Sequence, residues 1–263
     1  MMVGMAAGMN GALEIARMSF LDALRNRLLY GVLVFVVLLL LASLAIAAVT
    51  MGRTELLLLD LGLGALSIIG NLMAIVIAVQ SLQQEHAERT LYVLLTRLPS
   101  RGWYILGKFL GLAAVLGGLM VLMVMMLAAM VAVFGDIHWL SLAQALLATL
   151  FEIWIVLVFS LVFAQASSLF LAILLSFCMD IAGRFTSTIH QFSAQAEHAV
   201  LRWAGDAVYY LLPNLEAVNL RNGAGDIVSF GADRVLAVAA YGSIEIALLL
   251  AVSVWIFNRR NLS

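Results

Sequence analysis

The chain has 263 residues, of which 65% are hydrophobic and only 11% are charged, and its mean hydropathy is +1.10. An average soluble domain is about 45–50% apolar and about 25% charged. This composition therefore excludes a soluble globular enzyme, a disordered segment and a nucleic-acid-binding protein. Fourteen basic and fifteen acidic residues give a net charge of -1, which implies no overall attraction to nucleic acid or anionic lipid.

Six apolar segments predict helices that cross a bilayer. A crossing helix needs about 20 mainly apolar residues, and every backbone polar group in lipid must be bonded within the protein. We therefore predict an all-α polytopic integral membrane protein with a single transmembrane domain over residues 1–263. The predicted spans are 28–50, 61–82, 106–134, 140–164, 167–183 and 235–257.

The lysines and arginines predict the orientation of these spans. If the N-terminus is cytoplasmic, nine of them lie on the cytoplasmic side and five on the outer side. Because cytoplasmic loops carry the excess of basic residues, we expect both termini in the cytoplasm. The segment 83–105 is then cytoplasmic, and the segment 184–234 lies outside.

Residues 10–27 predict a helix before the first span. Apolar side chains recur there at helical spacing, and charged side chains occupy the other faces of the helix. This pattern is typical of a helix that lies in the membrane interface. The alternative is an ordinary positively flanked start of the first span. The apolar residues are Leu13, Ala16, Phe20 and Leu24.

The cytoplasmic segment 83–105 predicts a second amphipathic helix. Its leucine stripe has the spacing i, i+3, i+4 and i+7, and Pro99 is expected to end the helix. Acidic residues precede the stripe and basic residues follow it, as the helix dipole favours. The apolar face either docks on a protein partner or packs on the chain's own spans. The stripe is Leu91, Leu94, Leu95 and Leu98, flanked by Glu85, Glu88, Arg97 and Arg101.

The outer segment 184–234 is long for a connection inside a compact domain. Apolar residues keep helical spacing between Ile189 and Trp203, and the stretch "YYLLPNLEAVNL" follows. We expect one or two short helices packed at the outer mouth of the bundle.

Three stretches in this order resemble the membrane subunit of ABC exporters of the ABC-2 class. "IARMSFLDALRNR" is similar to that family's N-terminal elbow helix, "EHAERTLYVLLTRLPSRGWYILGKFLG" to its coupling segment, and "LLPNLEAVNLRNG" to the outer region before the last span. Arg89 stands where a glycine is common in the family. The subgroup that the chain resembles most comprises the permeases linked with maturation of multicopper enzymes such as nitrous oxide reductase.

The resemblance implies an ATP-driven exporter in the cytoplasmic (inner) membrane. Its partners would be two copies of a cytoplasmic ABC ATPase subunit and a second copy of this chain or a related permease. The chain has no Gly-x-x-x-x-Gly-Lys-[Ser/Thr] loop, so we expect no enzyme activity or cofactor in it, with ATP and Mg on the partner subunit. By position, the residues that would couple to the ATPase are Glu85, Glu88, Arg89, Thr90, Leu91, Leu94, Leu95, Arg97 and Arg101.

Two acidic residues, Glu152 and Glu245, fall near the middle of predicted spans. A charge at mid-bilayer costs about 2.5–3.5 kcal/mol on insertion scales, so such residues are candidates for function. The alternative is a protonated carboxyl bonded to a helix carbonyl or a polar side chain. No lysine or arginine is expected at mid-depth, so we predict no buried ion pair within the chain. Asp60 and Asp180 are expected to be solvated near outer span ends.

We predict no metal site. The chain has one cysteine, which excludes a multi-cysteine metal cluster. The third predicted span is rich in methionine, and thioethers can bind Cu(I), but methionine is a common gap-filler in apolar cores. We therefore expect these side chains to pack.

Two other functions remain alternatives. One is a non-transporting ABC membrane module that transmits mechanical work to a periplasmic partner through the outer segment. The other is a stand-alone secondary transporter or channel, which would be expected to show broken helices or an inverted repeat.

Overall fold

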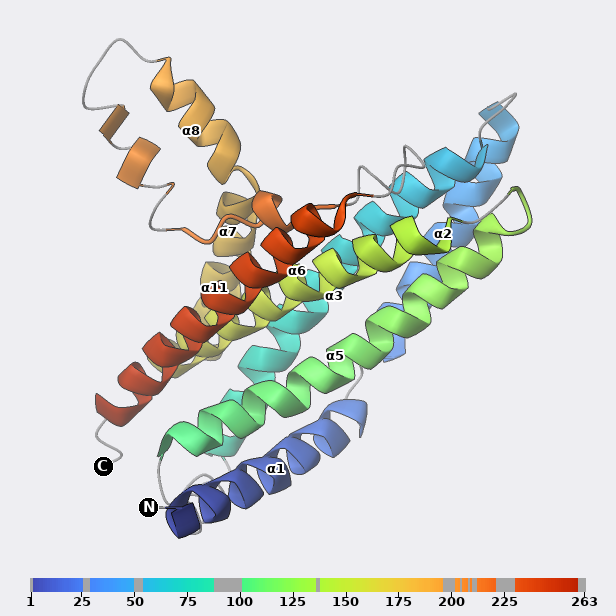
Figure 1. Ribbon diagram of the computed structural model, residues 1–263. Coiled ribbons are helices and arrows are strands. Elements are labelled where there is room, and N and C mark those ends of the chain that lie inside the picture. The colour runs from blue at the N-terminus through green and yellow to red at the C-terminus, as the bar shows by residue number, and fades with distance from the viewer. Residues whose placement is uncertain are drawn as a thin grey trace.

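The computed structural model describes residues 2–25, 29–49, 54–87, 101–135, 138–195, 202–203, 205–207, 209, 212–220 and 230–259. These residues form eight α-helices and one short 3-10 helix, and the described part contains no strand (Figure 1). The helices are α1 (Met2–Arg25), α2 (Leu29–Val49), α3 (Thr54–Ala87), α5 (Arg101–Val131), α6 (Trp139–Ala166), α7 (Leu169–Arg184), α8 (Thr186–Ala194), η1 (Glu216–Val218) and α11 (Ala232–Arg259).

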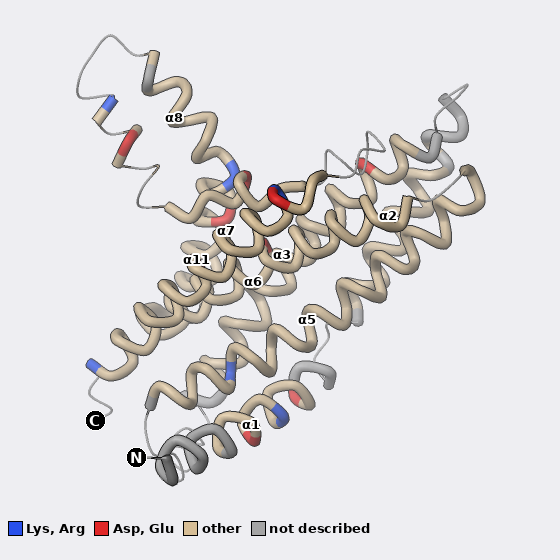
Figure 2. Tube along the Cα trace, viewed as in Figure 1, with Lys and Arg blue, Asp and Glu red and all other residues tan. Residues whose placement is uncertain are grey.

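Five stretches of helix are long and apolar enough to cross a membrane, which confirms a helical multi-pass membrane protein. They are Leu56–Gln84, Gly102–Val131, Trp139–Ala166, Leu169–Ser193 and Ala232–Arg259. The described side chains of α2 cover the apolar run Tyr30–Ser43, so the sixth span remains a prediction. Charged residues are sparse along the helices and gather near helix ends and at the junction of α7 and α8 (Figure 2).

Helices α3 and α6 form the most buried part of the bundle, and α11 lies along α6 (Figure 1). Glycines permit this close packing: a Cβ on Gly70 would lie 2.5 Å from Ile153 of α6, and one on Gly242 would lie 2.6 Å from Phe151. Small residues at helix contacts let backbones approach in membranes. Helices α7 and α11 expose many large apolar side chains, as expected of surfaces that face lipid or another protein.

Polar side chains bond the backbone groups that helix ends leave without a partner. Gln83 of α3 donates from Nε2 to the carbonyl oxygens of Ala164 at 2.9 Å and Ser167 at 2.8 Å, in the turn between α6 and α7. Gln144 of α6 bonds both the carbonyl and the N–H of Phe230, just before α11. Such bonds matter because an unpaired backbone group in an apolar environment is costly.

Helix α1 packs along the first turns of α5 and runs in the same direction (Figure 1). A Cβ on Gly107 would lie 2.5 Å from the carbonyl oxygen of Ala12, and one on Gly111 would collide with that of Ala16. The Gly-x-x-x-Gly spacing therefore brings the two backbones into contact. The opposite face of α1 is exposed and carries both charged and large apolar side chains, including Leu13, Glu14, Arg17, Met18 and Leu21.

We expect Gly111→Leu to displace α1 and to lower the stability of the protein. The new side chain would meet backbone atoms of Ala16, which cannot rotate away, and overpacking typically costs about 1–3 kcal/mol. Gly118→Leu is the matched control, because no atom lies within 4 Å of a Cβ at that position of the same helix. Thermal unfolding in one detergent measures both, and equal Tm values for the two variants would contradict the contact.

Candidate functional site

A buried ion pair joins α6 and α7 inside the bundle, so the prediction that no such pair exists was wrong. Nη2 of Arg184 lies 2.8 Å from Oε1 of Glu152, and the two side chains are 24% and 2% exposed. Glu152 lies in the middle of α6, and Arg184 is the last residue of α7.

The lengths of the helices explain why these charges meet. At 1.5 Å per residue, Glu152 is about 21 Å from the end of α6 and Arg184 is about 23 Å from the start of α7. Only a short turn, residues 167–168, connects the two helices. Arg184, which the sequence pattern placed in the outer segment, is therefore level with the middle of α6.

Two polar residues of α3 also bond Glu152. Ser67 Oγ donates to Oε1 of Glu152 at 2.8 Å, and Nδ2 of Asn71 donates to the same oxygen at 3.1 Å. Nη2 of Arg184 also donates to Oγ of Ser67 at 3.1 Å. Hydrogen bonds of this kind are needed to hold a charged group inside a protein, and here they tie α3 to α6 and α7.

Asp180 belongs to the same network, so the prediction that it is solvated was also wrong. It is buried one turn before Arg184, and its Oδ2 lies 3.3 Å from Nε of that arginine. Its Oδ1 accepts a hydrogen bond from Nδ2 of Asn71 at 2.8 Å. The charge cluster, defined as Ser67, Asn71, Glu152, Asp180 and Arg184, thus holds two carboxylates and one guanidinium. Asp60, by contrast, is exposed.

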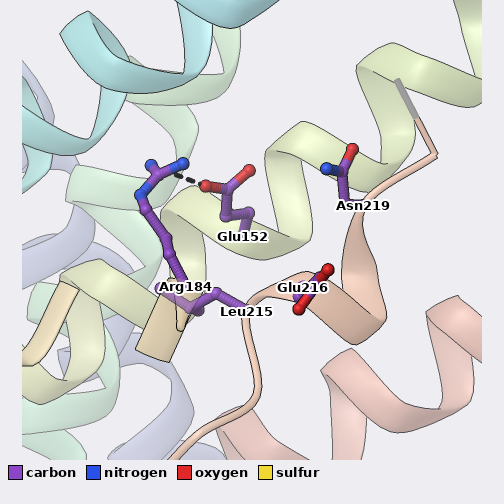
Figure 3. A pocket seen from close by; sticks show the side chains of 5 residues that line it. All are labelled: Glu152, Arg184, Leu215, Glu216 and Asn219. Carbon is purple, nitrogen blue, oxygen red and sulfur yellow. Dashed lines mark ion pairs between the residues drawn. The ribbon is translucent and has the colours of Figure 1, made fainter. Parts of the chain in front are cut away.

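A polar cavity of about 140 Å³ opens beside the charge cluster. Figure 3 shows Glu152 and Arg184 on one side and residues of the outer segment on the other. The lining residues are Glu152, Arg184, Leu215, Glu216 and Asn219. The cavity therefore reaches a charged side chain that is 2% exposed.

Residues 212–220 of the outer segment form the other wall of this cavity. The N–H of Leu215 donates to the carbonyl of Gly183 at 3.2 Å, and the N–H of Asn214 donates to the Tyr241 hydroxyl at 2.9 Å. Three apolar side chains anchor the segment below the surface: Leu215, Val218 and Leu220. The stretch read from the sequence as part of an outer region thus returns into the bundle beside Arg184.

The structure describes only some of the other predicted site residues. Glu245 is half-buried in α11, and no ion pair joins it to another described residue. Most of the coupling residues, Glu88 to Arg97, lie outside the described residues. The backbones of Glu85 and Arg101 lie in α3 and α5, but their side chains are not among those described.

The structure also bears on the predictions for a metal site and for the methionines. The described residues include no group of three His, Cys, Asp or Glu side chains that could hold a metal ion. Met120 and Met123 are buried in the apolar core, as predicted, whereas Met125 is exposed.

Lys108 of α5 is buried, and its Nζ donates to the carbonyl of Ser81 at 3.0 Å. The sequence pattern gave no sign of this burial.

An all-helical multi-pass bundle with a charge cluster at mid-helix depth is a helical membrane protein with a candidate functional site inside it. The chain matches the family model described as ABC-2 family transporter protein over residues 13–262 and belongs to this family. It is accordingly the membrane subunit of an ABC transporter, which works with an ABC ATPase subunit. No curated protein matches the chain.

Proposed function

We propose that this chain is the permease half of an ATP-driven exporter of the inner membrane. Two copies, each with six spans and cytoplasmic termini, form the transmembrane path, and two ATPase subunits bind below them. The family match over residues 13–262 carries this proposal. The chain itself hydrolyses no ATP and holds no cofactor; ATP and Mg bind to the partner.

The arrangement of α1, α3 and α5 supports a coupling surface at one end of the molecule. Residues 88–100 connect the end of α3 to the start of α5. The Gly107–Ala12 contact brings the N-terminal half of α1 beside that start. The elbow helix, residues 10–27, and the coupling segment, residues 83–105, would therefore present adjacent surfaces to one ATPase subunit.

The charged residues that flank the leucine stripe should act mainly on the rate of association. Rim charges at an interface steer encounter and are screened by salt. We expect Glu85→Arg and Glu88→Arg to weaken binding of the ATPase subunit at low salt and to lose this effect as salt is raised. Surface-immobilised permease and titrated ATPase subunit measure this. Asp233→Arg is the control, because Asp233 is exposed at the start of α11, outside both segments. A loss of ATPase-subunit binding that does not depend on salt would contradict the placement of Glu85 and Glu88 at the rim of the interface.

Within the exporter class, the resemblance of the coupling and outer segments favours the group linked with multicopper-enzyme maturation. The alternative is a module that transmits mechanical work to a periplasmic partner. Exposed aromatic side chains of the outer segment favour this alternative, with Phe192 73% and Trp203 72% exposed. Large aromatic side chains are often the anchors of a protein contact.

Copurification tests the proposal and separates it from the alternative. The tagged chain is expressed with the Walker-type ATPase of a neighbouring reading frame and is purified in mild detergent. Retention of the ATPase in equal amount, with hydrolysis of ATP by the complex, supports an ABC permease. A periplasmic protein retained in addition supports the mechanical module. Purification of the chain without any ATPase would contradict both.

A further inference from the structure

The cavity beside the charge cluster is large enough for a small head group. Its volume is about 140 Å³, close to the cavity of about 150 Å³ that binds benzene in an engineered protein. A group of about six non-hydrogen atoms therefore fits. The walls are Glu152 and Arg184 of the bundle and Leu215, Glu216 and Asn219 of the outer segment (Figure 3).

The charges around this cavity favour a cation over an anion. Two carboxylates and one guanidinium line it, and the guanidinium is already bonded to the buried carboxylates of Glu152 and Asp180. An anion would have to compete with both. The Glu216 side chain, in contrast, is exposed and has no ion pair with another described residue. Opposite charge at a binding surface sets specificity.

The lining fits an organic ammonium better than a metal ion. The described residues hold no group of three side chains with metal-ligand chemistry. A primary ammonium has three N–H donors, and the exposed carboxylate of Glu216 can accept from it. Leu215 adds an apolar wall against which attached methylene groups can pack.

We propose that this cavity binds the primary ammonium group of an alkylamine, carried by a free amine or by a lipid head group. The inference deepens the proposed function, because it names the class of head group that the transport path would recognise. Glu216 accepts charge-assisted hydrogen bonds from the ammonium, and Glu152 supplies the buried negative charge while it stays bonded to Arg184.

Binding can be measured on the purified chain by thermal unfolding, with ethanolamine, choline and ethylene glycol as probes. In nanodiscs of phosphatidylcholine, saturating ethanolamine is expected to raise Tm by about 5 °C. Choline, which has no N–H donor, and uncharged ethylene glycol are expected to leave Tm unchanged. A second nanodisc preparation contains phosphatidylethanolamine and no free amine. A rise in Tm there, without a response to ethanolamine, assigns the ammonium to the lipid and supports the same site.

Glu216→Gln tests the site without disturbing the buried network, because Glu216 is exposed. Loss of one charge-assisted hydrogen bond is expected to raise the Kd for the ammonium at least about ten-fold. Asp233→Asn, an exposed carboxylate at the start of α11, is the control and should bind as the natural chain does. No change in Tm with either source, or unchanged binding by Glu216→Gln, would overturn the proposal. Copurification of the ATPase from the same cells reports separately on the proposed function.

Discussion

Arg184→Gln is expected to destabilise the folded protein by about 3 kcal/mol. The substitution leaves two carboxylates, Glu152 and Asp180, buried without their common cation. Removal of one partner of a buried ion pair typically costs about 3–5 kcal/mol. The lower value applies here because the side chain of Arg184 is 24% exposed, so water can reach part of the site.

The ranking of three variants tests this prediction. Glu152→Gln should cost less than Arg184→Gln, because Arg184 keeps Asp180 as a partner and the amide can still accept from Ser67. Arg202→Gln is the control, since Arg202 is exposed in the outer segment, and it should unfold at the Tm of the natural chain. If Arg184→Gln unfolds at the same Tm as Arg202→Gln, the ion pair contributes nothing to the fold.

The class of protein could be predicted from the sequence because the signal is local. Twenty apolar residues in a row need no tertiary information to indicate a crossing helix, and the structure has such helices. The helix α3 runs from Thr54 to Ala87, beyond the predicted span 61–82 at both ends. Helix ends are harder to predict, because bonds from other elements, such as those of Gln83, decide where a helix can stop.

The charge cluster could not be predicted from the sequence, because it depends on how deep in the bundle each charged residue of α7 lies relative to Glu152. Arg184 and Asp180 were read as outer residues from their place in the sequence. Their burial follows from the length of α7, which ends level with Glu152. The position of α7 along α6 is in turn fixed by the packing of α7 against α3 and α6. The sequence did identify Glu152 as a candidate, because its position relative to the ends of one apolar segment is local information.

One packing contact has a recognisable signal in the sequence. Gly107 and Gly111 have the spacing that lets two membrane helices approach closely, and they are the residues that contact α1. The coupling residues between Glu88 and Arg97 had a strong signal, but they lie outside the described residues. Their role stays a prediction.

Replacement of Leu94 or Leu95 by Asp is expected to abolish binding of the ATPase subunit. An amphipathic helix that docks in a groove is held by its apolar anchors, and loss of a central anchor typically costs about 2 kcal/mol or more. That corresponds to a rise in Kd of about thirty-fold, and burial of the new carboxylate adds to it. Thr96→Asp is the control, because position 96 lies off the leucine stripe.

The most direct test of this coupling is the ATP hydrolysis rate of the complex in nanodiscs, measured with copurification of the ATPase subunit for these variants. We expect the natural chain and Thr96→Asp to retain the subunit and its hydrolysis. Leu94→Asp and Leu95→Asp should insert normally and lose both. Full retention of the subunit and of its rate in both Asp variants would contradict the claim that residues 83–105 couple this membrane subunit to ATP hydrolysis.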